Sequence, residues 1–293
     1  MKHLSSKLTF ILSMAIFGTI GLFVRLIPLP SSMIALVRAA MGAAFLLGMI
    51  LCQKRKPDWA GIRRNWKPLL LSSVAMATEW ILLFESYRYT TVAVATLCYY
   101  MSAVFVIIAA PLFLREKLTV HKALCAAAAV VGMVLVSGVL EGSAGAFSPV
   151  GVTLGLTAAF FYAVIVLCNK RVKNVSSYDT TFIQLFTVTL LLLPYVLLTE
   201  NVSDFGKLDP LGLAMLLSVG AVHTGIAYAM YFSSLQKIQA QTAALFSYLD
   251  PVIALFFSIF VLQEGMSVPG MIGAIIVLGA MLLSEREPTF QNQ

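Results

Sequence analysis

Two stretches decide the fold: Leu97–Thr119, which reads LCYYMSAVFVIIAAPLFLREKLT, and Leu245–Ser267, which reads LFSYLDPVIALFFSIFVLQEGMS. An offset of 148 positions aligns them and places Tyr100 on Tyr248. Each stretch is a long apolar run with polar or aromatic residues near its centre. Each ends in an acidic residue followed by a Thr or Ser that can cap the next helix. A segment that occurs twice in this way indicates an internal repeat, and internal repeats define whole architectures in membrane proteins.

The composition is that of a polytopic membrane protein. Of the 293 residues, 60% are hydrophobic and only 11% are charged, whereas soluble domains carry about a quarter charged residues. Apolar stretches of roughly 17–25 residues, long enough to cross a bilayer as helices, recur along the whole chain. We therefore predict an all-α membrane protein with ten transmembrane helices, at residues 7–27, 31–51, 68–88, 91–113, 121–140, 149–169, 178–198, 210–232, 241–262 and 268–284.

The distribution of Lys and Arg predicts the orientation of these spans. Sixteen of them lie on the side that holds Lys2, Lys7 and the 53–67 connection, against three on the other side, with Arg38 inside a span. Because cytoplasmic loops carry the excess of positive charge, we expect both termini in the cytoplasm of a bacterial cell and the spans in its inner membrane. The first apolar run is too long for a signal peptide and is interpreted as a retained helix.

The ten spans divide into two groups of five. Residues 141–148, EGSAGAFS, form a predicted external linker between a first repeat, residues 1–140, and a second, residues 149–293. Because five is an odd number, the second repeat must enter the membrane from the side opposite to the first. The sequence therefore predicts two inverted-topology five-helix repeats, an arrangement common among secondary transporters.

Several short motifs resemble the drug/metabolite transporter superfamily, and specifically its ten-helix EamA type. They are ALVRA at 35–39, PLFLREKLT at 111–119, LDPV at 249–252 and LQE at 262–264. The resemblance covers nearly the whole chain and implies a carrier that moves amino acids, other metabolites or drugs, mostly outward. The chain departs from the family at Phe17, where relatives often have Trp, and at Ala103, where its own second copy has Pro251. A relative's substrate is therefore not transferred to this chain.

Ionisable residues at mid-membrane depth are the first candidate functional groups, since each costs about 2.5–3.5 kcal/mol to insert at a helix centre. We predict that Glu79 and Asp250 bind protons and a substrate ammonium group in exchange; the alternative for each is a structural contact. Pro251 is expected to free a backbone carbonyl beside Asp250. Arg38 is predicted to form a structural ion pair, with a substrate carboxyl as the alternative partner. His223 is either a polar group of the binding site or a hydrogen-bonded core residue.

Aromatic residues are expected at the same depth and would suit an amphipathic amine. The predicted substrate-binding residues are Glu79, Trp80, Tyr99, Tyr100, Tyr162, His223, Tyr228, Tyr248 and Asp250.

Two further features have a structural and a functional interpretation. Glu116 and Glu264 end equivalent helices on opposite membrane faces, and we interpret them as structural, with gating as the alternative. Small residues such as Gly132 and Gly270 permit close helix contact in spans five and ten, either inside the monomer or in a homodimer.

These features predict export of a small amine-bearing metabolite, amino acid-like, or of a cationic drug by alternating access, coupled to protons. The alternatives are an uncoupled facilitator or channel and an uptake carrier. We find no HExxH motif, phosphate-binding loop or Ser–His–Asp order, so no enzymatic activity, catalytic residue or cofactor is predicted. The four cysteines lack metal-ligand spacing, and no metal is expected. The net charge of +7 follows from the loop bias and does not indicate a nucleic-acid partner.

Overall fold

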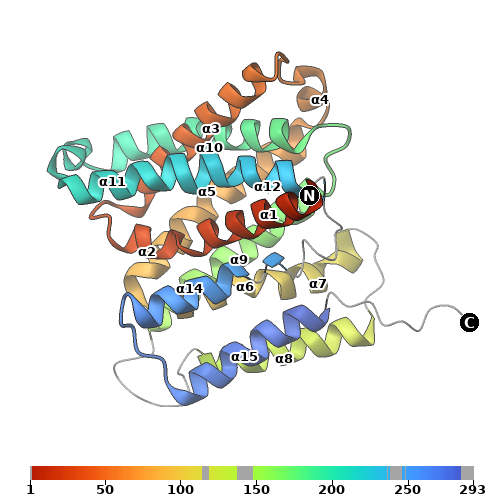
Figure 1. The fold of residues 1–293 in the computed structure, drawn as a ribbon, viewed down its shortest axis with the longest axis vertical. Helices are drawn as coiled ribbons and strands as arrows, with labels where there is room; N and C mark the ends of the chain where they lie inside the picture. The colour runs from red at the N-terminus through yellow and green to blue at the C-terminus, as the bar shows by residue number, and fades with distance from the viewer. Residues whose placement is uncertain are drawn as a thin grey trace, which may run out of the picture.

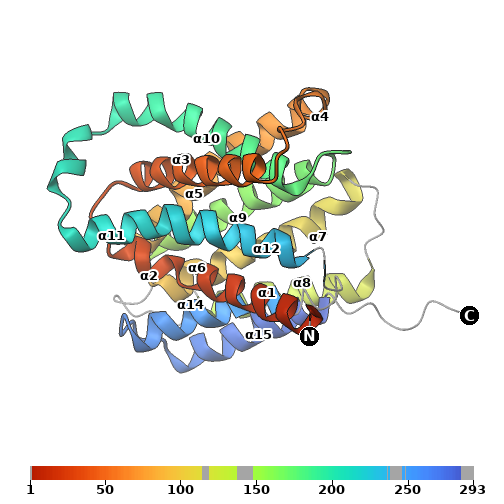
Figure 2. The same ribbon diagram turned by 45° about the horizontal axis from the view of Figure 1, so that its top comes forward.

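A computed structural model describes residues 2–113, 119–136, 148–235, 237, 246–247 and 249–284, and this part of the chain contains helices and no strand. The helices lie side by side in one bundle, with their connections at its two ends (Figures 1 and 2). Their bounds are α1 Lys2–Gly18, α2 Ile20–Arg25, α3 Ser31–Cys52, α4 Trp59–Arg64, α5 Trp66–Tyr89, α6 Val92–Tyr100, α7 Ser102–Phe113, α8 Val120–Val136, α9 Pro149–Asn169, α10 Ser177–Thr199, η2 Val202–Lys207, α11 Pro210–Ser218, η3 Val219–Ile226, α12 Ala227–Leu235, α14 Leu249–Phe260 and α15 Val268–Ser284.

Seven helical segments of the described part are long and apolar enough to cross a membrane. Three shorter apolar helices, α8, α14 and α15, accompany them. Each of the ten predicted spans overlaps one of these segments, and α9 and α15 have the bounds predicted from sequence. The seven long segments are Ser6–Arg25, Ser31–Cys52, Trp66–Tyr89, Val92–Ala109, Pro149–Asn169, Ser177–Thr199 and Pro210–Ser234.

Helix starts follow local capping chemistry. The side chain of Ser148 accepts a hydrogen bond from the Gly151 N–H, and Pro149 occupies the first turn of α9. A proline is well placed there, because the first N–H groups of a helix have no intrahelical partner. Asp209 and Pro210 repeat this arrangement at the start of α11.

Three of the predicted spans change their helical geometry along their length, which hydropathy did not predict. The first is interrupted at Thr19, between α1 and α2, where the Thr19 hydroxyl donates to the Ile16 carbonyl. The fourth is interrupted at Met101, between α6 and α7. In the eighth, the π-helical turn η3 separates α11 from α12. Such irregular turns present side chains that a regular helix would direct elsewhere, and π-turns often lie at functional sites.

Helices far apart in sequence pair along the bundle: α5 packs on α9, α3 on α10, α1 on α12 and α8 on α15. The last pair lies at the edge of the bundle (Figure 1). A Cβ atom added to Gly132 would lie 2.8 Å from the Gly273 carbonyl oxygen, so the two backbones are in direct contact. The small residues of spans five and ten are therefore used, at least here, in packing within the chain.

Some expectations fall at the edges of the described part of the chain. Pro251 is the third residue of α14 as described, and residue 248, between this helix and the helical residues 246–247, lies outside the described part, so the carbonyl that Pro251 is expected to free stays a prediction. Tyr248 and Glu116, like most of the predicted 141–148 linker, lie outside the described residues.

Candidate functional site

A cavity of about 630 Å³ lies at the centre of the bundle. We call it the central cavity. Its wall takes residues from α1, α2, α3, α5 and α6 in the first half of the chain, and from α9, α10, α12 and α14 in the second. The cavity is large enough for a small organic ligand.

Glu79 lies in this wall and is 1% exposed. It comes from α5, whose residues Glu79, Leu83 and Tyr87 recur at four-residue intervals along the cavity. The Tyr99 side chain interacts with it. Its Oε1 atom has no hydrogen-bond partner among the described residues. A buried carboxylate oxygen that lacks a partner is costly, so this atom is suited to receive a proton or a ligand donor.

Arg38, in α3, provides the positive charge of the wall and is 7% exposed. Its guanidinium carbon lies 3.9 Å from the centroid of the Trp80 ring. Its Nε atom donates to the Thr224 hydroxyl at 2.9 Å, and Thr224 is presented by the π-helical turn η3. Within the described residues no carboxylate lies at ion-pair distance from Arg38, so the predicted structural ion pair is not found there. Cation–π stacking on Trp80 and the hydrogen bond to Thr224 hold the guanidinium instead.

Asp250 brings a second carboxyl to the same cavity, from the first turn of α14. Its side chain interacts with that of Tyr100. The two acids predicted from sequence therefore come from opposite halves of the chain and line one space, together with Arg38. One cation and two carboxyls give the cavity groups of both signs.

His223 has a different position. Its Nε2 atom lies 3.0 Å from the Thr19 hydroxyl and its Nδ1 atom 3.1 Å from the Ser218 carbonyl oxygen. The Phe23 ring packs on the imidazole at a centroid distance of 4.7 Å. His223 is not among the residues that line the central cavity. Its position supports the core interpretation and not the predicted contact with substrate.

Aromatic side chains form much of the remaining wall. Tyr99 packs edge-on against Tyr162 at 5.2 Å and against Tyr100 at 6.0 Å. Phe17 contacts Tyr228 at 5.4 Å. The predicted residues Trp80, Tyr99, Tyr100, Tyr162 and Tyr228 thus all line the cavity.

Sequence reasoning missed several lining residues. Tyr87 could have been found, because it lies two helical turns after Glu79 on the same face of α5. Tyr231, one of the aromatic residues expected at this depth, also lines the cavity, one turn after Tyr228 on α12. Others have no local signal, since a buried polar residue inside an apolar run does not reveal which way it faces. The missed residues include Phe17, Tyr87, Thr96 and Gln184.

The central cavity reaches one end of the bundle, where Val172 and Val175 of the α9–α10 connection belong to its wall. Asn65 holds this connection through two hydrogen bonds with the backbone of Lys173. No described residue of the connections 26–30, 90–91 or 261–267, at the other end, lines the cavity.

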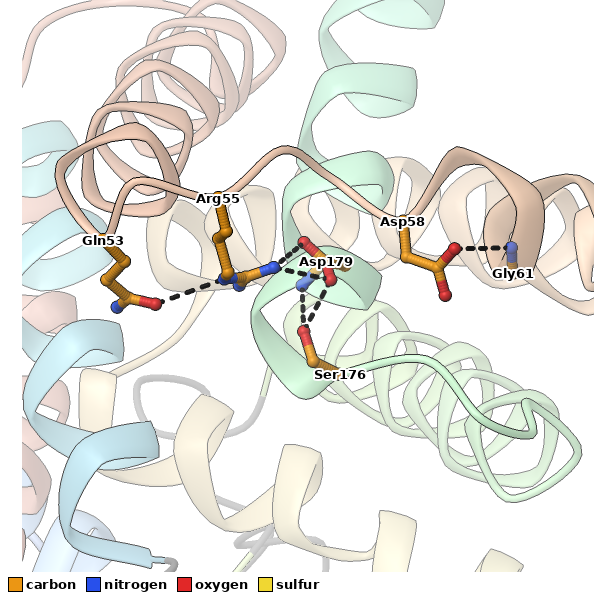
Figure 3. A network of polar contacts seen from close by, with 6 residues as sticks. All are labelled: Gln53, Arg55, Asp58, Gly61, Ser176 and Asp179. Atoms are coloured by element: carbon orange, nitrogen blue, oxygen red, sulfur yellow. Dashed lines mark hydrogen bonds and ion pairs between the residues drawn. The ribbon is translucent and has the colours of Figure 1, made fainter.

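A polar network fixes the start of α10 beside this mouth (Figure 3). Both carboxylate oxygens of Asp179 lie 2.9 Å from Nη1 of Arg55, in the α3–α4 connection. The Ser176 hydroxyl also donates to Asp179, at 2.8 Å. The network therefore joins the first half of the chain to the second at the mouth.

The described residues contain no group of three or more His, Cys, Asp or Glu side chains placed to bind a metal ion.

Helices that cross a membrane around a central cavity, with polar groups from both halves of the chain, define the class of membrane transport proteins. Both halves match the model of the EamA-like transporter family, over residues 4–138 and 149–285. The chain therefore belongs to this family and is a multi-pass membrane protein that transports small molecules.

Individual relatives agree with this assignment. The chain is 30% identical to the uncharacterized transporter YxxF of Bacillus subtilis, over 84% of this chain and 78% of the relative. It is 24% identical to the protein PecM of Dickeya dadantii, over 78% of this chain and 76% of PecM. A solved crystal structure of another protein superposes with a TM-score of 0.67 at 15% identity, over 96% of this chain and 97% of its own, and shows the fold alone.

Proposed function

We propose that this protein exports a small amine-bearing metabolite, amino acid-like, or a cationic drug from the bacterial cytoplasm by alternating access, in exchange for protons. The observation that carries the proposal is the pair of buried carboxyls, Glu79 and Asp250, in one cavity. An ionised carboxylate removed from water needs a proton or a cation as its partner. A site that accepts either one is what proton-for-amine exchange requires.

The other groups of the cavity support an amphipathic organic ligand. Arg38 is without a carboxylate partner in the described residues and would pair with a substrate carboxylate, as in an amino acid. Tyr99, Tyr162 and Tyr228 offer aromatic faces to apolar parts of the ligand or to its ammonium group. The proposed substrate-binding set is therefore Glu79, Trp80, Tyr99, Tyr100, Tyr162, Tyr228 and Asp250, with Arg38 added.

We further propose ten membrane spans arranged as two inverted repeats, residues 1–140 and 149–293, joined by residues 141–148. The repeat offset of 148 places α8 on α15, and these two helices are antiparallel. His121 near the start of α8 contacts the Leu283 carbonyl near the end of α15 at 2.7 Å. This orientation supports an inverted repeat, and the separate family matches to the two halves support the division.

The sidedness follows from charge. The described chain begins in α1 and ends in α15 at the same end of the bundle, and the α9–α10 connection lies at that end too (Figure 1). This connection contains Lys170, Arg171 and Lys173. Because positive loops stay inside, we propose that this end and both termini are cytoplasmic, in the inner membrane. The central cavity would then face the cytoplasm in this conformation.

A homodimer through spans five and ten stays a prediction. Since Gly132 and Gly273 already contact each other within the chain, a second copy would have to use the outer faces of α8 and α15. Exposed apolar residues such as Val131 and Ile275 lie on these faces.

Flux through purified protein in proteoliposomes tests the function. A thermal-shift screen of amino acids, polyamines and cationic drugs first identifies a ligand, because a ligand stabilises the state that binds it. With that ligand inside, acidifying the outside should accelerate its export, as protons enter in exchange. Glu79→Gln and Asp250→Asn should each remove the acceleration, whereas Asp204→Asn, in a surface ion pair with Lys207, should keep it. Full acceleration in both cavity variants would refute the coupling.

A further inference from the structure

We propose that Glu264 is the gate residue that closes the end of the bundle opposite to the cavity mouth. Its side chain, 11% exposed, bridges the two halves of the chain. Its Oε2 atom accepts hydrogen bonds from the Val92 backbone N–H at 2.8 Å and from the Ser258 hydroxyl at 2.6 Å. Its Oε1 atom lies 3.7 Å from Nη2 of Arg25. Glu264 and Ser258 belong to the second half, whereas Val92 and Arg25 belong to the first.

The start of α6 explains why an acidic residue is needed here. Val92 and Ala93 are the first two residues of α6, so their N–H groups have no partner within the helix. Glu264 accepts from the first, and the Ser258 hydroxyl accepts from the second at 3.1 Å. The positive end of the helix dipole adds to the attraction of the carboxylate. Thr91 caps the same turn through the Val94 N–H, and the second half of the chain completes the N-terminal capping of this helix of the first half.

A second cavity lies directly outside this contact. It has a volume of about 360 Å³ and is lined by Arg25, Arg88, Thr90 and Glu264, among others. We call it the outer cavity. It shares no lining residue with the central cavity. The two spaces are therefore separated by protein, with no single residue facing both.

Gly21 and Val92 form the apolar part of that barrier. Gly21 lines the central cavity, and a Cβ atom on it would collide with the Val92 side chain. Val92 is 1% exposed, and its own N–H is the group that Glu264 holds. Gly21 and Val92 both belong to the first half, so moving α14 and the connection after it away from α6 would break the Glu264 contact and uncover Val92 from the side of the second half.

The bonds of this gate are of a kind that can break and re-form. Arg25 is 36% exposed and its ion pair is long, so water can replace it at little cost. Glu264 faces the outer cavity and can be hydrated when the gate opens. The gate rests on the alternating-access mechanism proposed above, in which the two halves must separate at this end in one state.

Accessibility of a single cysteine tests the gate independently of transport. Thr96 lines the central cavity and is 4% exposed. In Thr96→Cys protein, freed of its four native cysteines, a small membrane-impermeant thiosulfonate added on the side of the outer cavity should react slowly. Adding Glu264→Gln removes the charge that holds Val92 and Arg25, and should raise this rate by about tenfold or more. Arg25→Gln removes only the long, partly exposed ion pair and should raise the rate less.

The matched control is Arg88→Gln. Arg88 also lines the outer cavity, but its ion pair is with Glu85 of the same helix and does not connect the two halves of the chain. Adding Arg88→Gln should leave the labelling rate of the cysteine at position 96 equal to that of the Thr96→Cys protein. The proposal is overturned if neither Glu264→Gln nor Arg25→Gln accelerates labelling, or if Arg88→Gln does so equally. If labelling changes as expected but no variant transports any ligand, the gate stands and the proposed function fails.

Discussion

The contact between α8 and α15 predicts the effect of a single methyl group. A Cβ atom added by Gly273→Ala would lie 2.5 Å from the Gly132 carbonyl oxygen, 2.8 Å from the Leu135 Cβ atom and 2.9 Å from the Val136 nitrogen. Two of these three neighbours are backbone atoms, which cannot rotate away. The helices must therefore move apart, and overpacking of this kind costs about 1–3 kcal/mol.

Gly279→Ala is the matched control, because Gly279 lies in the same helix and a Cβ atom there meets nothing within 4 Å. Both variants gain the same intrinsic helix preference of alanine, about 1 kcal/mol. The difference between them therefore reports the packing cost alone. Each variant is heated in detergent, and the fraction that stays folded is measured by size-exclusion chromatography. The unfolding midpoint of Gly273→Ala should lie roughly 2–10 °C below that of Gly279→Ala. Equal midpoints would show that α8 and α15 do not pack through these glycines.

Two further substitutions test the polar contacts around the central cavity. Arg38→Lys keeps the charge but loses the planar stacking on Trp80 and the Nε donor to Thr224. We expect the free energy of unfolding to fall by about 1–3 kcal/mol. We also expect the ligand to stabilise this variant less in thermal-shift assays. Arg55→Gln leaves the Asp179 carboxylate, 3% exposed, without its cation and should lower the unfolding midpoint by an amount that corresponds to about 1–3 kcal/mol. An unchanged midpoint in either variant would contradict the contact concerned.

The helical segments could be predicted from sequence because the membrane imposes a length and a hydropathy that local composition reveals. Residues 149–169 and 268–284 were predicted with the bounds that α9 and α15 have. Glu79 and Asp250 could also be found, since an acid inside an apolar run is rare and therefore informative. Only the fold shows that they line one cavity.

The remaining features depend on contacts between distant residues. The partner of Arg38 is an aromatic ring and a hydroxyl rather than a carboxylate, and nothing in the local sequence distinguishes these. The interruption at Thr19 and the π-helical turn at 219–226 occur in runs whose composition would suit a regular helix. Glu264 was expected at a helix end, whereas α14 ends at Phe260 and Glu264 lies in the connection that follows. Its contact with Val92, 172 positions away, appears only in the fold.

Chemical blockage of the central cavity tests the account most directly. Thr181 lies in its wall, on α10, whereas Leu190 of the same helix is 55% exposed on the outer surface. In proteoliposomes that transport an identified ligand, attaching a bulky thiol reagent to Thr181→Cys should abolish flux, and the ligand should slow the attachment. The same reagent on Leu190→Cys should leave flux intact. Undiminished flux after complete modification of Thr181→Cys would show that the substrate does not pass through this cavity.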